Sequence, residues 1–537
     1  MEMIELTLAL LLAVAAVGAL ANWVPLPLPI LLFGAGLGLS YIPAFADLRI
    51  EPEVFFLLFI PPLLFGDGWL IPKREFVNLL RPILLLAFGL VFLTVIVVGY
   101  FMHWLIPSLP LAAAFALGAV VSPTDAVAVS SITEKLKIPS RATYILNGES
   151  LINDASGLVA FRFAVAAVAT GSFSGSEATV QFVLLSAGGF LVGLAVAWLI
   201  GMMRLALVNF SVADPKILTV ISLLTPYAAY LAAERLGVGG ILAVVASALY
   251  AGSHDTRHLD AETRAHSWEV WRMVLFAFNG LVFLLLGLEL HSLAQSVVEI
   301  GWATLGGYAL ALAAIVIALR LLWVYPAAYL PLLLSRRIRE REGSYSPRAV
   351  FLIGWSGIRG AVTLAAALSL PYTTASGAPF PGRDLIIVLA ASVIVISLLL
   401  NGLSLPFLIR ALGIRGDGIA EREERSARMA IAQAAMHALR EELPKLRLAN
   451  EVAYAKGLID EYERRVDETA AETGEESRVL GRRALQRLRL AAIQAERDEL
   501  LHLRDTDVIN EEVLRVVQSE LDHAESVVRA SNSRDAG

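Results

Sequence analysis

The chain has 537 residues, of which 57% are hydrophobic and only 17% are charged. A soluble protein has about 45–50% apolar and about 25% charged residues, so this composition indicates a membrane protein. The absence of cysteine excludes disulfide bonds and thiolate metal sites. The formal net charge of −6 averages two unlike parts, because long apolar runs extend to about Leu412 and charged residues are dense after it. We therefore predict a transmembrane domain over 1–412 and a helical cytoplasmic C-terminal domain over 413–537.

A membrane-spanning helix needs about 20 mostly apolar residues. Thirteen stretches of the predicted transmembrane domain meet that requirement. In chain order they are 4–22, 26–46, 54–71, 82–106, 110–134, 141–170, 178–205, 217–235, 238–252, 271–291, 302–333, 347–371 and 384–410. We therefore predict an all-α membrane protein with about thirteen transmembrane helices. The first stretch has no basic start and no obvious cleavage site, so we interpret it as a retained helix, with a signal anchor as the alternative.

Lys and Arg residues gather in every second connection between these stretches. Segments such as "PKREFVNLLR" and "SRRIREREGSYSPR" carry several of them, whereas "PSLP" and "GSFSGSE" carry none. Connections rich in Lys and Arg stay in the cytoplasm, so we expect the N-terminus outside and the C-terminal domain inside. The expected location is the plasma (inner) membrane, which the chain crosses many times.

The fifth predicted span contains "GAVVSPTDAVAVSS", an unusually polar segment for the middle of a membrane. Pro123 lacks a backbone donor and clashes with the preceding turn, while Ser122 and Thr124 can satisfy the backbone groups that this frees. We predict a helix broken at mid-membrane. Asp125 then starts the second half, where the helix dipole favours a carboxylate.

The sixth predicted span contains "NGESLINDASG", and polar residues at such depth commonly mark a functional site. A helix that starts with this span places Asp154 about 20 Å along its axis, near the bilayer midplane. At 100° per residue, Asn147, Ser150 and Asp154 form one stripe, and Glu149 and Asn153 form another. The two carboxylates therefore point in different directions, and we expect them to have different roles.

The twelfth predicted span contains "GWSGIRGAVTLAAALSLP", in which Gly357 and Gly360 bracket Arg359. We interpret it as a second interrupted helix around a buried cation. Interrupted helices in both halves of a membrane protein indicate the substrate site of an inverted-repeat transporter. The alternative is that Gly and Pro merely kink these helices, but that alone does not explain a charged residue at each interruption.

Several other ionisable residues lie within the predicted spans. Those considered as candidates are Asp67, His103, Arg162, Glu234, Glu289 and Arg320. Glu234, Glu289 and Arg320 lie near span ends or irregular stretches, so we expect structural or interfacial roles for them. His103 lies near the outer end of its span, where an isolated histidine most often has no special function.

Taken together, these motifs resemble the cation–proton antiporters, specifically the bacterial sodium–proton antiporter branch related to NhaP and the NHE exchangers. The resemblance extends over nearly the whole membrane part, through "FIPPLLFGDGW", "SPTDAVAV", "NGESLINDASGLVAF", "LGVGGILAVVASALYAG", "NGLVFLLLGLEL" and "GIRGAVTLAAALSLP". "SPTDAVAV" together with "NGESLINDA" is highly specific. The resemblance implies inverted repeats, two crossing broken helices in the fifth and twelfth spans, and a homodimer.

The resemblance also implies roles for single residues. Asp154 matches the family's essential cation- and proton-binding aspartate, and Asn153 completes an Asn-Asp pair that is associated with electroneutral exchange. Ser150 matches a side-chain ligand, and Thr124 and Asp125 match the contribution of the broken helix. The residues implied to hold sodium, a hard cation that prefers oxygen ligands, are therefore Asp154, Asp125, Ser150 and Thr124.

Two further features concern the surroundings of this site. Glu149 and Arg359 match a buried ion pair that braces span six against span twelve. The family usually has an acid directly after "PPLLF", but here Gly66 follows that motif and Asp67 comes next. A shift of one residue rotates a side chain by about 100°, so the sequence leaves open whether Asp67 reaches the ion.

The resemblance implies secondary active, electroneutral sodium–proton antiport, in which sodium and proton compete for Asp154 during alternating access. The main alternative is a potassium–proton or broad monovalent cation–proton antiporter of the same fold. A cation channel, or an ion sensor with the tail as output, is a weaker alternative because the polarity clusters at one depth. An intramembrane hydrolase would need a base beside Ser150, and no histidine lies at the midplane.

The remaining expectations concern partners and soluble parts. We expect no enzyme activity, no cofactor beyond transported Na⁺ and H⁺, no nucleic acid, and contacts with membrane lipid and a second copy of the chain. His254, His258 and His266 could sense pH, although a plain solvated loop is the favoured interpretation. The tail, including "EEVLRVVQSELDHAESVVRA", has the spacing of amphipathic helices that pack on each other or regulate transport.

Overall fold

The computed structural model describes 2–470 except for 22, 25, 47–50, 126–128, 130–137, 171–174, 211–213, 259–260, 297–299, 344 and 375–376. Beyond 470 it describes 488–500, 502–503 and scattered positions up to 528. The chain forms two compact units, Met1–Gly416 and Asp417–Gly537. The described secondary structure is helical apart from one isolated bridge between Thr373 and Pro379, so the predicted all-α fold is confirmed.

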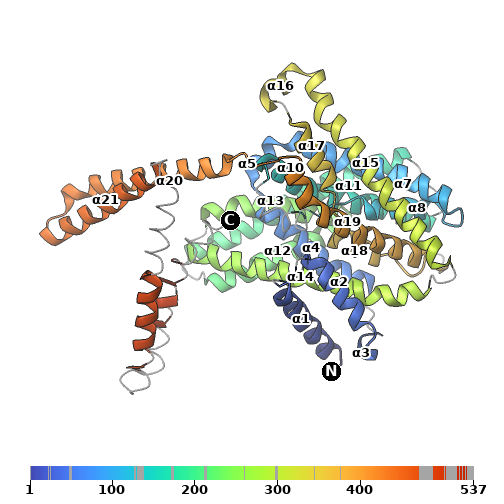
Figure 1. The fold of residues 1–537 in the computed structure, drawn as a ribbon, viewed down its shortest axis with the longest axis horizontal. Helices are drawn as coiled ribbons and strands as arrows, with labels where there is room; N and C mark the ends of the chain where they lie inside the picture. Colours follow the sequence, from blue (N-terminus) through green and yellow to red (C-terminus); the bar gives the residue numbers. More distant parts are fainter. Residues whose placement is uncertain are drawn as a thin grey trace. The chain divides into compact units, whose positions relative to one another are not determined.

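The first unit contains the helices that correspond to the predicted spans, together with short helices in the connections (Figure 1). They are, in chain order, α1 (Glu2–Leu20), α2 (Leu28–Leu39), α3 (Pro43–Ala46), α4 (Pro52–Leu70), α5 (Lys73–Asn78), α6 (Leu80–Leu84), η1 (Leu85–Leu90), α7 (Val91–Leu105), α8 (Leu111–Val121), α10 (Ser140–Thr170), α11 (Gly175–Asn209), α12 (Pro215–Arg235), α13 (Gly240–His258), α14 (Ala261–Ser296), α15 (Trp302–Leu334), α16 (Arg336–Glu342), α17 (Pro347–Trp355), α18 (Ala361–Leu368) and α19 (Arg383–Ala411).

Eight helices in the described part of the chain are long and apolar enough to cross a bilayer. Three shorter apolar helices lie at Glu5–Leu20, Leu28–Leu39 and Leu111–Val121. The predicted ninth span corresponds to α13, whose last turns are polar. The second half of the predicted fifth span lies outside the described residues.

Close packing of α2 against α14 depends on two glycines. A Cβ on Gly36 would lie 2.0 Å from the carbonyl oxygen of Leu284, and one on Gly287 would lie 2.1 Å from that of Phe33. Small residues let membrane helices approach this closely, and lipid-exposed helices have no hydrophobic force to drive them together. The close α2–α14 contact therefore depends on the absence of a side chain at Gly36 and at Gly287.

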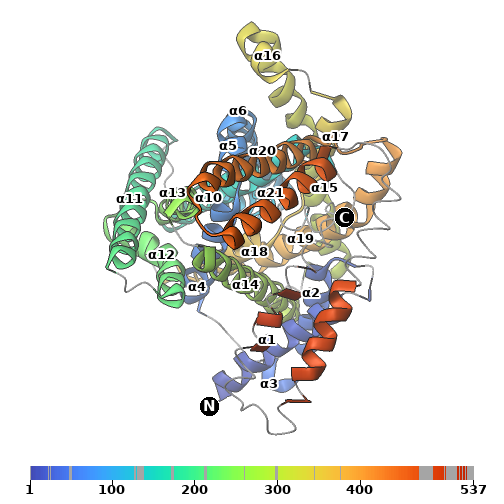
Figure 2. The ribbon, with the colours of Figure 1, turned by 90° about the vertical axis from the view of Figure 1, so that its left-hand side faces the viewer.

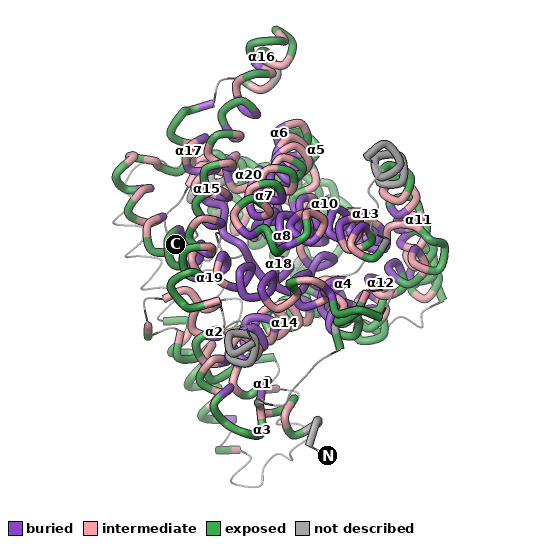
Figure 3. Tube along the Cα trace, turned by 90° about the vertical axis from the view of Figure 1, so that its right-hand side faces the viewer, coloured by how far each residue is buried: buried purple, intermediate pink, exposed green. Residues whose placement is uncertain are grey.

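Burial is concentrated in the helices around the two broken spans (Figure 3). α8 and α18 are buried along almost their whole length, whereas α11 exposes much of its surface. α11 and α12 lie together at one edge of the unit, packed beside α13 (Figure 2). The two helices that adjoin the breaks, α8 and α18, are thus buried inside the unit.

The predicted fourth span is interrupted by a π-helix, η1, between α6 and α7. π-Helical turns leave carbonyl groups without their usual intrahelical partner. Here the Ser156 hydroxyl donates to the carbonyl of Ala87 at 2.5 Å, and the Trp323 indole donates to that of Leu85 at 2.9 Å. The irregular turn therefore binds α10 and α15, and hydropathy alone did not predict it.

The second unit begins with α20 (Ile419–Glu442), the short helix η4 (Leu443–Lys445) and α21 (Ala449–Ala470). α20 packs against α21, and Arg440 and Glu463 form an ion pair between them at 2.6 Å. This contact agrees with the expectation that helices of the tail pack on each other. Of the stretch "EEVLRVVQSELDHAESVVRA", the structure describes only 517–518, 520–522, 524–525 and 528.

Candidate ion-binding site

The two predicted helix breaks meet inside the first unit. α8 ends at Val121, and the chain from Ser122 to Asp125 is not helical. The second break separates α17 from α18. The backbone N–H of Asp125 donates to the carbonyl oxygen of Ile358 at 2.7 Å, which joins one break directly to the other. The predicted crossing of the two interrupted helices is therefore confirmed.

A buried arginine satisfies the C-terminal end of each interrupted helix. Nε of Arg359 donates to the carbonyl of Val121, the last residue of α8, at 3.0 Å. Nε of Arg320 donates to the carbonyl of Gly354 at 3.1 Å, and its Nη2 to that of Ile353 at 3.1 Å, near the end of α17. The last carbonyls of a helix have no intrahelical partner and carry partial negative charge, so a cation stabilises them.

The opposite charge lies at the start of α18. Gly360 is the residue that precedes this helix, and a Cβ added to it would lie 1.9 Å from Oδ2 of Asp125. The carboxylate therefore occupies the space that a side chain would need, at the positive N-terminal end of the helix. Each break thus supplies the charged residue that stabilises the helix end of the other.

Asp67, Asp125 and Asp154 line one small cavity beside this crossing. They come from α4, from the first break and from α10. Ser150 and Thr124 also line the cavity. The complete lining is Leu63, Asp67, Thr124, Asp125, Ser150, Asp154, Asn279, Gly360, Ala361, Val362 and Thr363. Three carboxyl groups and several hydroxyl or amide oxygens therefore surround a space at the level of both breaks.

The structure brings Asp67 to the cavity, which the sequence had left open. Gly66, in the position where the family usually has its acid, packs elsewhere: its missing Cβ would lie 2.5 Å from a methyl group of Leu275. On the sixth span, Ser150 and Asp154 face the cavity as their common stripe predicts. Asn147, on the same stripe, is not among the residues that line it.

The predicted ion pair between Glu149 and Arg359 is wrong. Glu149 is 0% exposed, and Arg320 binds it through both guanidinium ends, with Nη2 donating to Oε2 at 2.9 Å and Nη1 donating to Oε1. Arg359 reaches instead toward α8 and also donates to the carbonyl of Gly357. The brace therefore joins α10 to α15. Arg320 has the expected structural role, but it lies in the middle of α15 and not near a span end.

Asn153 acts on the neighbouring break rather than on the cavity. Its Nδ2 donates to Oγ1 of Thr124 at 2.7 Å, and that hydroxyl donates to Oε1 of Glu149 at 3.3 Å. Glu149 and Asn153 share a stripe, and both connect through Thr124. This chain of hydrogen bonds fixes Thr124 relative to α10 and leaves Ser150 and Asp154 on the other stripe.

Two polar cavity residues were not identified from the sequence. Asn279 comes from α14 and opens the motif "NGLVFLLLGLEL", and Thr363 lies in the first turns of α18. Oγ1 of Thr363 is buried and has no hydrogen-bond partner among the described residues. A polar residue opening an otherwise apolar run was the available signal for Asn279.

Other polar residues of the predicted spans have identifiable partners. Arg162 pairs with Glu234 at 2.6 Å and donates to the Tyr230 hydroxyl at 2.7 Å, joining α10 to α12. A ring nitrogen of His103, Nδ1, lies 2.7 Å from the carbonyl oxygen of Leu109. These contacts are structural.

The three histidines predicted in a loop lie on helices or at a helix end. His254 is half-buried on α13 and stacks on Tyr250, with ring centroids 4.8 Å apart. His258 is the last residue of α13, and the position of its side chain lies outside the description. His266 is exposed on α14. The interpretation of these histidines as part of a solvated loop is therefore wrong, because they lie on α13 and α14.

Residues 8–411 match the model of the family described as "Sodium/hydrogen exchanger, transmembrane". The chain belongs to the sodium/hydrogen exchanger family. The match includes both breaks, the crossing and every residue that lines the cavity. The resemblance that the sequence motifs suggested is confirmed, and the transmembrane antiporter architecture follows.

Named relatives extend this result over almost the whole exchanger chain. It is 38% identical to a "Sodium, potassium, lithium and rubidium/H(+) antiporter" of Bacillus pumilus, over 95% of this chain and 76% of the relative. It is 36% identical to an "Uncharacterized Na(+)/H(+) exchanger YjcE" of Escherichia coli, over 99% of this chain and 100% of the relative.

A solved structure shares the fold. The sodium proton antiporter MjNhaP1 of Methanocaldococcus jannaschii superposes with a TM-score of 0.58 at 17% identity, covering 77% of this chain and 99% of that one. At this identity the likeness supports the arrangement of helices alone.

Proposed function

We propose that this exchanger carries one monovalent cation against one proton through the cavity between the crossed breaks, and that Asp154 binds both in turn. The observation that carries this proposal is the convergence of Asp67, Asp125 and Asp154 on one buried space. Carboxylates at membrane depth are costly unless they bind a charge. A cation or a proton supplies that charge.

Competition at Asp154 explains coupling. A carboxyl group that holds a proton is a poor cation ligand, and one that coordinates a cation has a lower affinity for the proton because the cation stabilises its ionised form. Asp154 is 5% exposed, so its empty, charged state is disfavoured during passage across the membrane. Only the two loaded states then cross readily, and the fluxes of cation and proton become linked.

The remaining lining supplies ligands suited to a hard cation. Ser150 and Thr124 offer hydroxyl or backbone oxygens, and Asp125 is held at the start of α18. We propose Asp154, Asp125, Ser150 and Thr124 as the sodium ligands, with Asp67 completing the carboxylate set and Asn153 positioning Thr124. Oxygen ligands of this kind suit sodium and related alkali ions.

Alternating access requires one wall of the cavity to move relative to another. α10 and the two breaks form one wall and are tied together by Glu149, Arg320 and Arg359. α4 and α14 contribute Asp67 and Asn279 to the facing wall. Movement of the first wall against the second would expose Asp154 to each side in turn.

A broad monovalent cation range is the second candidate. It is favoured by the 38% identical relative, whose name includes sodium, potassium, lithium and rubidium. Carboxylate and hydroxyl oxygens accept all four ions, and selectivity among them is a matter of cavity size. We propose sodium–proton exchange as the core activity, with this wider range as the alternative.

The cellular setting is also a proposal. The alternation of Lys- and Arg-rich connections supports a multi-pass protein of the plasma (inner) membrane, with its N-terminus outside and its tail in the cytoplasm. The family resemblance supports a homodimer surrounded by membrane lipid.

The test is exchange by the purified full-length protein in proteoliposomes loaded with a pH-sensitive dye. An outward proton gradient is collapsed by sodium, lithium or potassium added in turn. We expect a sodium response that Asp154→Asn abolishes, while Asp214→Asn, a matched exposed aspartate outside the cavity, leaves it intact. Asp214 caps α12 by accepting from Lys216, and asparagine caps equally well. Sodium-dependent proton movement in a folded Asp154→Asn protein would refute the assignment.

A further inference from the structure

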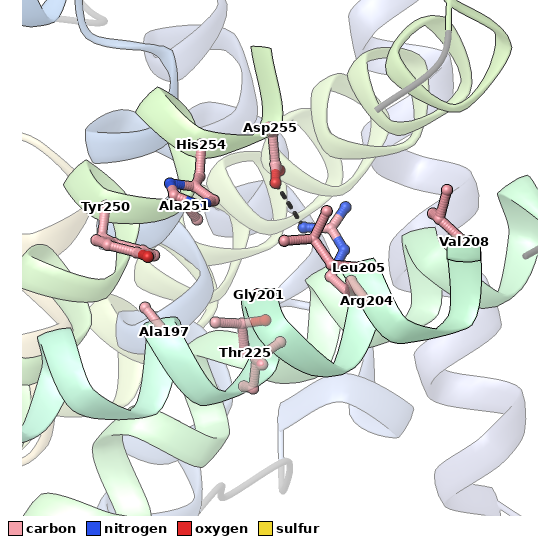
Figure 4. A pocket seen from close by; sticks show the side chains of 11 residues that line it. Ala197, Gly201, Arg204, Leu205, Val208, Thr225, Tyr250, Ala251, His254 and Asp255 are labelled. Carbon is pink, nitrogen blue, oxygen red and sulfur yellow. Dashed lines mark hydrogen bonds and ion pairs between the residues drawn. The ribbon is translucent and has the colours of Figure 1, made fainter. Parts of the chain in front are cut away.

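A second pocket lies apart from the ion cavity, between α11, α12 and α13 (Figure 4). None of its lining residues belongs to the ion cavity. Most of the lining is apolar: Ala197, Ile200, Gly201, Leu205 and Val208 on α11, with Ala251 on α13. The polar part consists of Arg204, Thr225, Tyr250, His254 and Asp255.

Arg204 is charged, buried and only partly satisfied. It is 5% exposed, and its Nη1 donates to Oδ1 of Asp255 at 2.7 Å. Its Nε and Nη2 are buried and have no hydrogen-bond partner among the described residues. Leaving a buried charged donor unsatisfied costs more than about 1–3 kcal/mol. Two such nitrogens on one guanidinium indicate an acceptor that binds in the pocket.

The second oxygen of Asp255 does not meet these two nitrogens. Oδ2 of Asp255 already accepts from the Trp69 indole at 3.1 Å. Lys73 lies beside Gly252 of α13, and its ammonium group donates to the carbonyl of Trp69 at 2.5 Å. Among the described side chains here, one carboxylate lies with two basic groups, and this excess of positive charge suits an anionic acceptor.

The outer surface of α11 shows where that anion comes from. Leu199, Met202 and Met203 are 58%, 50% and 46% exposed, beside Gly201 and Arg204 of the pocket. A surface of this kind in a membrane protein faces hydrocarbon. The pocket therefore offers guanidinium nitrogens and apolar walls next to lipid, and Arg binds phosphate groups well through its planar fork.

We propose that this pocket binds an anionic phospholipid, with the lipid phosphate on Arg204 and the adjoining hydrocarbon along α11 and Tyr250. The site lies at the end of α11 where Lys and Arg residues of the connections gather, which is where anionic head groups concentrate. Binding there joins α11 to α13, and α13 packs on α4, the helix of Asp67.

The test measures lipid retention and thermal stability of the purified full-length protein in detergent, independently of transport. Phosphatidylglycerol, phosphatidylcholine and inorganic phosphate are added separately. We expect phosphatidylglycerol to raise the unfolding temperature and to stay bound in native mass spectrometry. Phosphatidylcholine should have a weaker effect, and inorganic phosphate none.

Two variants separate the pocket from general lipid contact. A Cβ on Gly201 meets only Cε1 of Tyr250, at 3.8 Å, so Gly201→Leu fills the pocket without disturbing the Arg204–Asp255 pair. We expect Gly201→Leu to weaken phosphatidylglycerol binding about tenfold, because the leucine keeps the lipid phosphate from one charge-assisted hydrogen bond with Arg204. Gly306→Leu is the control, because Gly306 is exposed on α15 with nothing within 4 Å of its Cβ position.

Arg204→Lys keeps the charge and removes the fork, and we expect the same direction of change. Equal phosphatidylglycerol retention by parent, Gly201→Leu and Gly306→Leu would overturn the proposal. Stabilisation by inorganic phosphate that matches phosphatidylglycerol would also overturn it, because the site would then bind a free anion. Loss of sodium–proton exchange in any variant bears on the proposed function and not on this binding site.

Discussion

Glu149 is a full negative charge at a place from which water is excluded. Its stability there depends on Arg320, which binds both carboxylate oxygens, and on the Thr124 hydroxyl. Arg320 in turn completes the C-terminal end of α17. Because each group satisfies the others, removing one leaves an uncompensated charge or carbonyl behind.

We expect Glu149→Gln to lower the free energy of unfolding by about 3–5 kcal/mol, because it leaves the Arg320 charge buried without a counter-ion. The double variant Glu149→Gln with Arg320→Met should recover part of this loss, since no charge is then stranded. Recovery stays incomplete because the carbonyls of Ile353 and Gly354 lose their donor. Thermal unfolding in detergent measures both. A Glu149→Gln protein as stable as the parent would show that the pair does not brace the fold.

Lys73 provides a pH-dependent contribution outside the membrane-spanning segments. Burial lowers the pKa of its ammonium group from 10.5 to about 8, and the Asp255 carboxylate opposes that shift. Between these two pH values the unfolded chain binds more protons than the folded one, so this residue makes stability rise with pH. The contribution should be absent in Lys73→Met.

The measurement is the difference in unfolding temperature between the parent and Lys73→Met from about pH 7 to about pH 10. We expect the difference to move in favour of the parent as pH rises. Taking the difference cancels the titration of groups that both proteins share. A constant difference over the range would mean that Lys73 has an ordinary pKa in the folded protein.

For single residues, the sequence predicts which face of a helix a side chain occupies better than it predicts which side chain it contacts. Helical phase separates Glu149 from Asp154, and the structure agrees: Asp154 lines the cavity and Glu149 does not. It cannot tell which of two buried arginines meets Glu149, because that depends on how α15 and α17 pack. Arg359 is the arginine that the family resemblance pairs with Glu149, but its Nε donates to the carbonyl of Val121 at the end of α8.

The two interrupted helices form one structural unit, although they lie far apart in the chain. Their breaks share the hydrogen bond between Asp125 and Ile358, and each has its C-terminal end bound by a buried arginine. Pro123 and the glycines around Arg359 allowed both breaks to be predicted. Their contact could be expected only through family resemblance, because no local pattern records which distant segment lies opposite.

Gly360→Ala tests this arrangement with one methyl group. The added Cβ would lie 1.9 Å from Oδ2 and 2.3 Å from Cβ of Asp125, too close for a small adjustment. We expect Asp125 to be displaced from the start of α18 and cation-dependent proton movement to fall at least about tenfold, as for a misplaced catalytic group.

Gly34→Ala is the control, since Gly34 is exposed on α2 with nothing within 4 Å of its Cβ position. Both proteins should be compared for yield and unfolding temperature before transport is measured in proteoliposomes. Parental exchange by a folded Gly360→Ala protein would show that Asp125 is not needed at that position.

Helix ends were predicted less well than helix centres. α13 continues to His258 and α11 to Asn209, past the ends of the predicted apolar runs. Polar side chains near these ends pair with each other, as Arg204 and Asp255 do at 2.7 Å, so the helices continue past the apolar runs. Hydropathy indicates where a helix leaves the hydrocarbon core of the membrane. It does not indicate where the backbone hydrogen bonds of the helix end.

At the scale of the whole molecule, the exchanger must carry charge across a membrane without leaving charge behind. The buried carboxyl groups of the cavity face a protein wall that already contains Glu149, Arg320 and Arg359. Those three keep their partners within α8, α10, α15 and the two breaks. Under the proposed mechanism, the net charge that crosses in each half-cycle is therefore set by what Asp154 holds.

A proton and a monovalent cation each contribute one positive charge at Asp154, so the two loaded states have equal charge and exchange should be electroneutral. We expect the rate of sodium–proton exchange in proteoliposomes to be unchanged when a potassium gradient with valinomycin imposes a membrane voltage, with sodium and pH gradients held fixed. A cycle that moved one net charge would gain or lose about 2.3 kcal/mol per 100 mV of voltage. Such a difference would change the direction or extent of proton movement clearly, and its appearance would replace one-for-one exchange by a cycle in which a second proton, bound at Asp67 or Asp125, accompanies the first.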